Sequence, residues 1–163
     1  MSSSSQSALL VTIVLSSPSD WDEWLTVVKS KALMVEIWWF IDPSTNKQLQ
    51  PILEKLVMPT STTVNPTKDS YTELDMIKTI QYKAFLVNYK HKVSKHDQQA
   101  TALQGMCTFI QGTIFRNYFT FMMNCDNAYE ILTTLKCHII LMDQIRKMKL
   151  LAKYQRLKKA LRI

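Results

Sequence analysis

Near the N-terminus, apolar side chains recur every three or four residues, which is the period of one face of an α-helix. The positions that keep this rhythm are Trp21, Trp24, Leu25, Val28, Ala32, Val35 and Trp39. Ser17 is a suitable N-cap, and proline at position 18 suits the first helical turn. Asp42-Pro43 ends the pattern, because proline disfavours a helical conformation in the preceding residue. The pattern predicts a helix from about residue 18 to about residue 42.

Two further helical patterns occupy the middle of the chain. The first begins at Thr72-Glu73 and places apolar residues at Leu74, Ile77, Phe85, Tyr89 and Val93. The second follows the polar segment 96–99 and lines one face with Leu103, Met106, Ile110 and Ile114. Gly105 and Gly112 each weaken that helix by about 1 kcal/mol relative to alanine, so close packing against a neighbour is expected there.

Two more helices are predicted in the last forty residues. Asp126 is the expected cap of a short helix, whose apolar positions are Ala128, Ile131, Leu132 and Leu135. Asp143 is the expected cap of the final helix, whose apolar stripe is Leu150, Tyr154, Leu157 and Leu161. Basic residues lie on both sides of this stripe when the segment is placed on a helical wheel.

The segment between the first two helices is expected to be a connector. Residues 44–70 contain Pro51, Pro59 and Pro66 with a Ser/Thr-rich patch, and show little periodicity beyond one possible helical turn around Leu53–Val57. We therefore divide the chain into an N-terminal tail, residues 1–16, and one helical domain, residues 17–163, that includes this connector.

Composition supports a helical class. Apolar residues make up 47% of 163 residues, enough for one domain with its own core. Only two glycines occur, whereas β-rich and nucleotide-binding folds depend on glycine for tight turns and phosphate loops. These observations predict an all-α, single-domain helical bundle of about five helices.

The cysteines and the N-terminal residues indicate an intracellular, cytoplasmic protein. Cys107, Cys125 and Cys137 are an odd number at wide spacing, which fits neither a disulfide framework nor a zinc ribbon. A secretory signal requires Lys or Arg before its apolar run, and none precedes Ala8–Leu15. This run is also too short to cross a bilayer.

The net charge of +7 lies entirely at the C-terminus. Residues 143–163 hold one acid, Asp143, and eight basic residues: Arg146, Lys147, Lys149, Lys153, Arg156, Lys158, Lys159 and Arg162. Such a helix would attract nucleic-acid phosphate. We favour nonspecific RNA contact over a solvated polar face, and either over docking on a membrane surface or a partner helix.

Eight large apolar residues are assigned to assembly or to the core. They are Trp21, Trp24, Trp38, Trp39, Leu103, Met106, Ile110 and Ile114. Their helical spacing favours packing over base stacking. Trp38 and Trp39 point about 100° apart on a helix, so both cannot fill one pocket. One of the two is therefore a candidate for a contact between subunits.

No catalytic or metal-binding pattern is found. Asp20, Asp22 and Glu23 complement a helix dipole without a partner histidine nearby. His91 and His96 are five residues apart, and Cys137-His138 has no second ligand pair. The Asp-Thr/Ser-Gly of an aspartic protease, a phosphate loop and a nucleophile elbow are all missing. We expect no enzyme, no cofactor, no metal and no small-molecule substrate.

Four strings, in order, resemble the Gag polyproteins of fungal Ty/copia-type LTR retrotransposons. They are PSDWDEWLTVVKSKALMVEIWWFIDPS (18–44), HDQQATALQGMCTFIQGTI (96–114), NCDNAYEILTTLK (124–136) and LLAKYQRLKKA (150–160). Gag proteins usually continue into further helices and a zinc knuckle, which do not follow here, and the 139–145 stretch is more apolar than their usual turn.

The resemblance implies the first part of a capsid region. A Gag fragment would self-associate into homo-oligomers or particles and would hold RNA through its basic terminal helix. The alternatives are a small helical binding module that docks on a membrane or a partner protein, and a non-functional remnant of the element.

Overall fold

The computed structural model describes residues 13–161, and its regular elements are helical. The α-helices are α1 (Trp21–Met34), α2 (Trp38–Ile41), α3 (Ser61–Val64), α4 (Met76–Gly112), α5 (Phe119–Met122) and α6 (Ala128–Ala160). Four 3-10 turns join them: η1 (Pro18–Asp20), η2 (Lys47–Leu49), η3 (Tyr71–Glu73) and η4 (Arg116–Tyr118). Over this range, extended pairing is limited to one isolated bridge, Leu15 with Ile114. The all-α class is confirmed.

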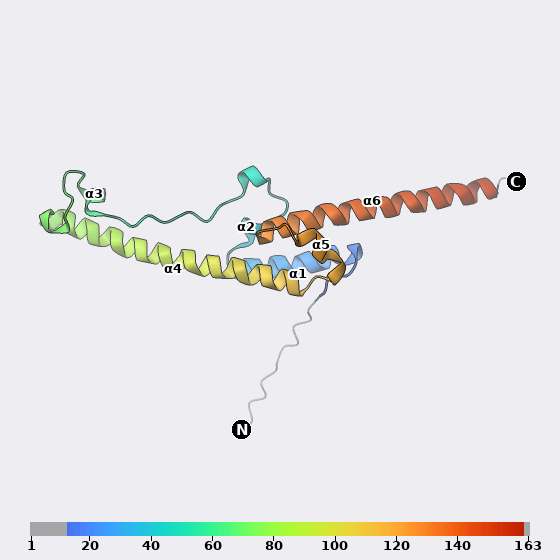
Figure 1. Ribbon diagram of the computed structural model, residues 1–163, viewed down its shortest axis with the longest axis horizontal. Coiled ribbons are helices and arrows are strands. Elements are labelled where there is room, and N and C mark those ends of the chain that lie inside the picture. Colours follow the sequence, from blue (N-terminus) through green and yellow to red (C-terminus); the bar gives the residue numbers. More distant parts are fainter. Residues whose placement is uncertain (1–12, 162–163) are drawn as a thin grey trace, which may run out of the picture. The chain divides into compact units, whose positions relative to one another are not determined.

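The described residues form two compact units (Figure 1). Unit 1 combines residues 13–50 with residues 104–161, and unit 2 consists of residues 51–103. The long helix α4 runs through both, with its last nine residues in unit 1. The core described below belongs to unit 1.

Helices α1, α4 and α6 supply most of the core of unit 1. Trp24 is fully buried, and its indole Nε1 donates a hydrogen bond to Thr113 Oγ1 at 3.0 Å. Other buried side chains are Val28, Ala32, Ile37, Ile41, Met106, Ile110, Ile131, Leu132, Leu135 and Ile139. Of the face predicted for the first helix, Trp21, Trp24, Val28 and Ala32 are therefore core residues, whereas Val35 and Trp39 are exposed.

The expected N-terminal tail is partly integrated into this unit. Residues 1–12 lie outside the described range, but Leu15 is fully buried. Its N–H donates to Thr113 O at 2.8 Å, and its carbonyl accepts from Phe115 N–H at 2.9 Å. The two segments, 13–16 and 113–115, thus lie side by side.

The first predicted helix is interrupted before its expected end. α1 stops at Met34, and the chain turns through Glu36, whose φ is 54°, before the short α2 begins at Trp38. Glu36 N–H donates to Leu33 O at 3.1 Å and Ile37 N–H donates to Ala32 O at 2.9 Å. This is the Schellman arrangement, which usually has glycine in the left-handed position. A glutamate there gave no signal of a helix end.

Replacing Glu36 with glycine is expected to raise the free energy of unfolding by about 0.5–1 kcal/mol. A side chain with a Cβ is strained at positive φ, and the gain is reduced by glycine's freedom in the unfolded chain. Urea unfolding would measure it. Glu36→Ala keeps the Cβ and should give no such gain; an equal gain from alanine would contradict the backbone explanation.

The other predicted boundaries also differ. α4 continues through the polar segment 96–99, where two helices were expected, because no proline or glycine breaks the helix before Gly105. The turn expected around Leu53–Val57 is absent, and the helical turns of the connector are η2 and α3 instead. α6 is one helix of 33 residues where two were predicted.

Neither glycine of α4 meets a close neighbour, so the expected close packing is wrong. A Cβ added at Gly105 or Gly112 would have no atom within 4 Å. Gly105→Ala should therefore stabilise the chain by about 1 kcal/mol, since alanine is the better helix former. Thermal unfolding would test this, with Gly112→Ala at the helix end as a control of smaller effect. A loss of stability at Gly105 would show an unrecognised close contact.

Candidate nucleic-acid interface

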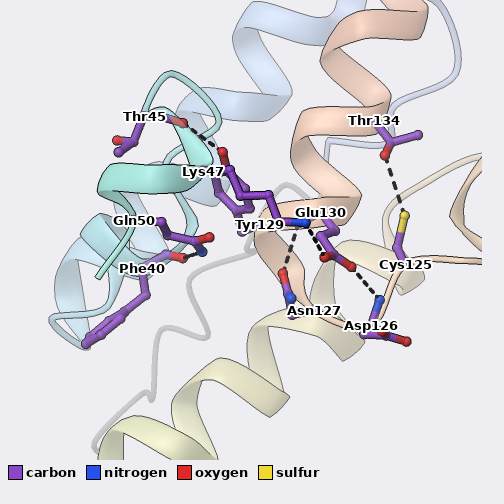
Figure 2. A network of polar contacts seen from close by, with 10 residues as sticks. All are labelled: Phe40, Thr45, Lys47, Gln50, Cys125, Asp126, Asn127, Tyr129, Glu130 and Thr134. Carbon is purple, nitrogen blue, oxygen red and sulfur yellow. Dashed lines mark hydrogen bonds and ion pairs between the residues drawn. The ribbon is translucent and has the colours of Figure 1, made fainter. Parts of the chain in front are cut away.

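The N-terminal half of α6 anchors the helix in unit 1 (Figure 2). Tyr129 Oη donates to Thr45 O at 2.7 Å, and Lys47 Nζ lies 3.4 Å from Glu130 Oε1. Lys136 Nζ donates to the carbonyl of Pro43 at 3.4 Å. Together with buried Leu132, Leu135 and Ile139, these bonds tie the 43–47 loop and the core to the first turns of α6.

Asn127, not Asp126, caps α6. Its side chain accepts from Glu130 N–H at 3.0 Å, and Glu130 Oε2 accepts from Asp126 N–H at 3.0 Å (Figure 2). The first bond satisfies one of the N–H groups that a helix start leaves without a partner, and the second ties the residue before the cap to the first turn. The Asp126 N–H bond is the main cause of a lowered pKa for Glu130, and Lys47 adds to it.

The lowered pKa of Glu130 predicts a pH-dependent contribution to stability. Because the unfolded chain binds the proton more tightly, the contribution is present above the ordinary glutamate pKa and is lost as pH falls through the lowered value. Unfolding measured from about pH 6 to about pH 3 should depend less on pH in Glu130→Gln than in the unchanged chain. Parallel pH profiles for the two proteins would contradict this.

The C-terminal half of α6 carries no buried residue. From Ile140 to Leu161, every described side chain is exposed except Asp143, which is half-buried. These residues continue α6 without a break, as the red end of the helix in Figure 1 shows. At 1.5 Å per residue this half is about 30 Å long. It presents its side chains to solvent around the whole circumference.

Seven of the eight predicted RNA-binding residues lie on this exposed half. They are Arg146, Lys147, Lys149, Lys153, Arg156, Lys158 and Lys159, and Arg162 lies outside the described residues. Four of them, Arg146, Lys149, Lys153 and Arg156, are spaced by three or four positions and share one side of the helix. We call these four the basic ridge. They span about 15 Å along the axis.

One acid is present on the exposed half, and it is paired. Asp143 was expected to cap a new helix, but it lies inside α6 and its Oδ2 is 2.7 Å from Lys147 Nζ. The pair is an i,i+4 contact. Lys147 is not part of the basic ridge. Over the described residues, no ion pair involves a ridge side chain, so the ridge keeps its positive charge available to a ligand.

An apolar stripe runs beside the basic ridge. Leu150, Tyr154, Leu157 and Leu161 are 59%, 62%, 55% and 87% exposed. Such contiguous exposure of large apolar side chains is characteristic of a surface that binds a partner. We call these four residues the α6 stripe.

The structure assigns most of the eight assembly-or-core residues to the core. Trp21, Trp24, Met106, Ile110 and Ile114 are buried, and Leu103 is half-buried. Met106, Ile110 and Ile114 therefore belong to the core of unit 1. Trp38 is half-buried, and Lys29 Nζ lies 5.5 Å from the centre of its ring. Trp39 is 43% exposed, and its ring contacts that of Phe40. Trp39 is the more exposed of the two adjacent tryptophans, which makes it the candidate for a subunit contact.

Sequence reasoning missed a second exposed apolar region in unit 1. Val14, Phe115, Phe119, Phe121 and Met123 are all more than one third exposed. Five phenylalanine and methionine side chains within residues 115–123 were the available signal. They do not follow a helical period, so the apolar pattern did not indicate an exposed face there.

Potential catalytic and metal-binding side chains are scattered. Within residues 13–161, no three His, Cys, Asp or Glu side chains are grouped so that they could hold a metal ion. His138 stacks on Phe121, with ring centroids 3.8 Å apart, and burial raises the pKa of the Cys107 thiol. Among these same residues, no helix is long and apolar enough to cross a bilayer.

No family model, curated protein or solved structure matches this chain.

Proposed function

We propose that this chain is a structural Gag-type module of a copia-type retrotransposon, which self-associates and holds RNA through the C-terminal half of α6. The observation that carries the proposal is the exposed basic ridge on a helix anchored at its other end. The four Gag-like strings, which fall largely on the helices of an all-α chain, support the same assignment. The RNA contact is electrostatic and independent of sequence.

The RNA half of the proposal predicts steep salt dependence. For a single strand, the logarithm of the binding constant falls with log[salt] at about −0.7 per phosphate contacted. Four to seven contacts give a slope between about −3 and about −5, or roughly 50- to 900-fold weaker binding between about 50 and about 200 mM salt. Fluorescence anisotropy with an unstructured labelled RNA would measure it. Binding that is unchanged over this range would contradict the proposal.

The exposed α6 stripe favours a second candidate, a small helical binding module that docks on a membrane surface. An amphipathic helix with basic flanks binds anionic lipid through its apolar face. Cosedimentation with vesicles of anionic and neutral composition, beside the RNA titration, separates the two. Vesicle binding without RNA binding would support the second candidate and contradict the first.

Self-association is the other half of the proposal. Trp39 and the α6 stripe are exposed apolar groups on unit 1, and they can be covered by a second copy. Sedimentation of nuclease-treated protein should show oligomers at high micromolar concentration. A monomer under those conditions would contradict this half while leaving the RNA contact intact.

A further inference from the structure

Val14 and Phe115 are exposed apolar residues where residues 13–16 run beside residues 113–115, and Phe119 follows at the start of α5. Val14, Phe115 and Phe119 are 45%, 49% and 43% exposed. The backbone bonds of Leu15 to Thr113 and Phe115 hold the two segments together. We call Val14, Phe115 and Phe119 the aromatic surface.

Three acidic residues follow the 13–16 segment of the aromatic surface in the chain, and we call them the acidic rim. Asp20 lies in η1, and Asp22 and Glu23 are exposed in the first turn of α1. Asp20 accepts from Ser16 N–H at 3.1 Å, which places it beside the 13–16 segment. The pKa of Tyr118 in η4 is raised mainly by burial and also by the negative charge of Asp20. Arg116 is the basic residue of η4, and the rim remains net negative.

The α6 stripe has the opposite charge arrangement. Its apolar residues are flanked by Lys and Arg on both sides, and the acid of that half is already paired with Lys147. The two surfaces are therefore complementary: both have an apolar centre, and the charges around the two centres are opposite in sign.

We infer that the α6 stripe of one copy docks on the aromatic surface of a second copy, with Lys and Arg side chains of α6 facing Asp20, Asp22 and Glu23. This inference rests on the self-association proposed above and names its two surfaces. A second copy of α6 fits the stripe less well, because the basic flanks of two α6 helices would repel each other. The two surfaces occur on every chain, so the contact is head-to-tail.

The size of the contact is that of a small, transient interface. The three aromatic side chains bury about 150–250 Å² each when fully covered, and the four aliphatic ones somewhat less. Because the seven are roughly half exposed, they contribute about 700 Å². With the stems of the flanking Lys and Arg the total is about 1,000 Å², at the lower end of specific interfaces. Association should therefore appear at high micromolar concentration. Head-to-tail contacts form rings or open chains.

Two complementary variants of the full chain test the inference. The stripe variant carries Leu150→Asp and Leu157→Asp, and the surface variant carries Phe115→Asp and Phe119→Asp. All four side chains are exposed, so circular dichroism should show the helical content of the unchanged chain. Nuclease-treated samples are compared by sedimentation velocity, each alone and as an equimolar mixture.

A head-to-tail contact predicts that each variant alone is at least about 10-fold weaker in association, whereas the mixture forms a 1:1 dimer and nothing larger. The dimer forms because each variant keeps the surface that the other has lost. Self-association of the surface variant alone, at the strength of the unchanged chain, would overturn the inference and leave the proposed self-association standing.

Other occupants of the stripe give different results. Association of the unchanged chain that disappears after nuclease treatment would assign the stripe to RNA, and monomeric unchanged chain that binds anionic vesicles through Leu157 would assign it to a membrane. Either result overturns the inference. In the vesicle case the proposed self-association also fails, whereas the surface-variant result described above leaves it intact.

Discussion

Replacing Trp24 with alanine is expected to lower the free energy of unfolding by about 3–5 kcal/mol, the range for removing a large aromatic side chain from a packed core. Trp24 has no exposed area, and it joins α1 to the end of α4 through its bond to Thr113. Domains of this kind have a total stability of about 5–15 kcal/mol, so the variant should be substantially unfolded at moderate temperature. Urea unfolding followed by circular dichroism would measure the change.

Two controls separate the parts of this effect. Trp39→Ala removes the same type of side chain from a 43% exposed position, so it should lower the free energy of unfolding far less. Thr113→Val conserves volume but leaves the buried indole N–H without an acceptor, with an expected cost of about 1–3 kcal/mol. If Trp39→Ala lowered the free energy of unfolding as much as Trp24→Ala, the assignment of the core would be wrong.

Replacing all four residues of the basic ridge with glutamine is expected to weaken RNA binding roughly 100-fold or more at about 100 mM salt. Each lost phosphate contact also removes about 0.7 from the salt slope, so the slope should become shallower by about 3. Glutamine is a good helix former, and no described ion pair is broken, so α6 should stay helical. Anisotropy titrations at several salt concentrations would measure affinity and slope together.

The matched control makes the same change of charge elsewhere. Lys83, Lys90, Lys92 and Lys95 are exposed on α4, and their replacement by glutamine also removes four positive charges. If RNA contacts α6 specifically, this control should retain most of the affinity and nearly the full salt slope. Equal losses in the two variants would show that net charge, and not the ridge, governs binding.

Helical periodicity predicted much of unit 1 because the period and the burial agree. Trp21, Trp24, Val28 and Ala32 follow the expected face, and all four are buried. The start near Pro18 was also correct, with the carboxylate of Asp20 accepting from Ser17 N–H at 2.8 Å. These features are local, since spacing and first-turn residues are sufficient to specify them.

Helix ends were predicted poorly because they depend on backbone geometry and on packing. Glu36 adopts a left-handed conformation that glycine usually takes, so no residue marked the end of α1. Asp126 and Asp143 are good cap residues by type, yet Asn127 caps α6 and Asp143 lies within it. A polar or acidic residue ends a helix only where the chain also leaves the helical conformation.

Two apolar stripes of the chain look alike in the sequence. Leu103, Met106, Ile110 and Ile114 recur at spacings of three and four, as do Leu150, Tyr154, Leu157 and Leu161. The first stripe lies largely in the core, whereas every residue of the second is more than half exposed. Period and composition establish the helices, their amphipathic faces and the concentration of charge at the C-terminus. Which face is covered depends on segments distant in the sequence that pack against it, and only the three-dimensional arrangement contains that information.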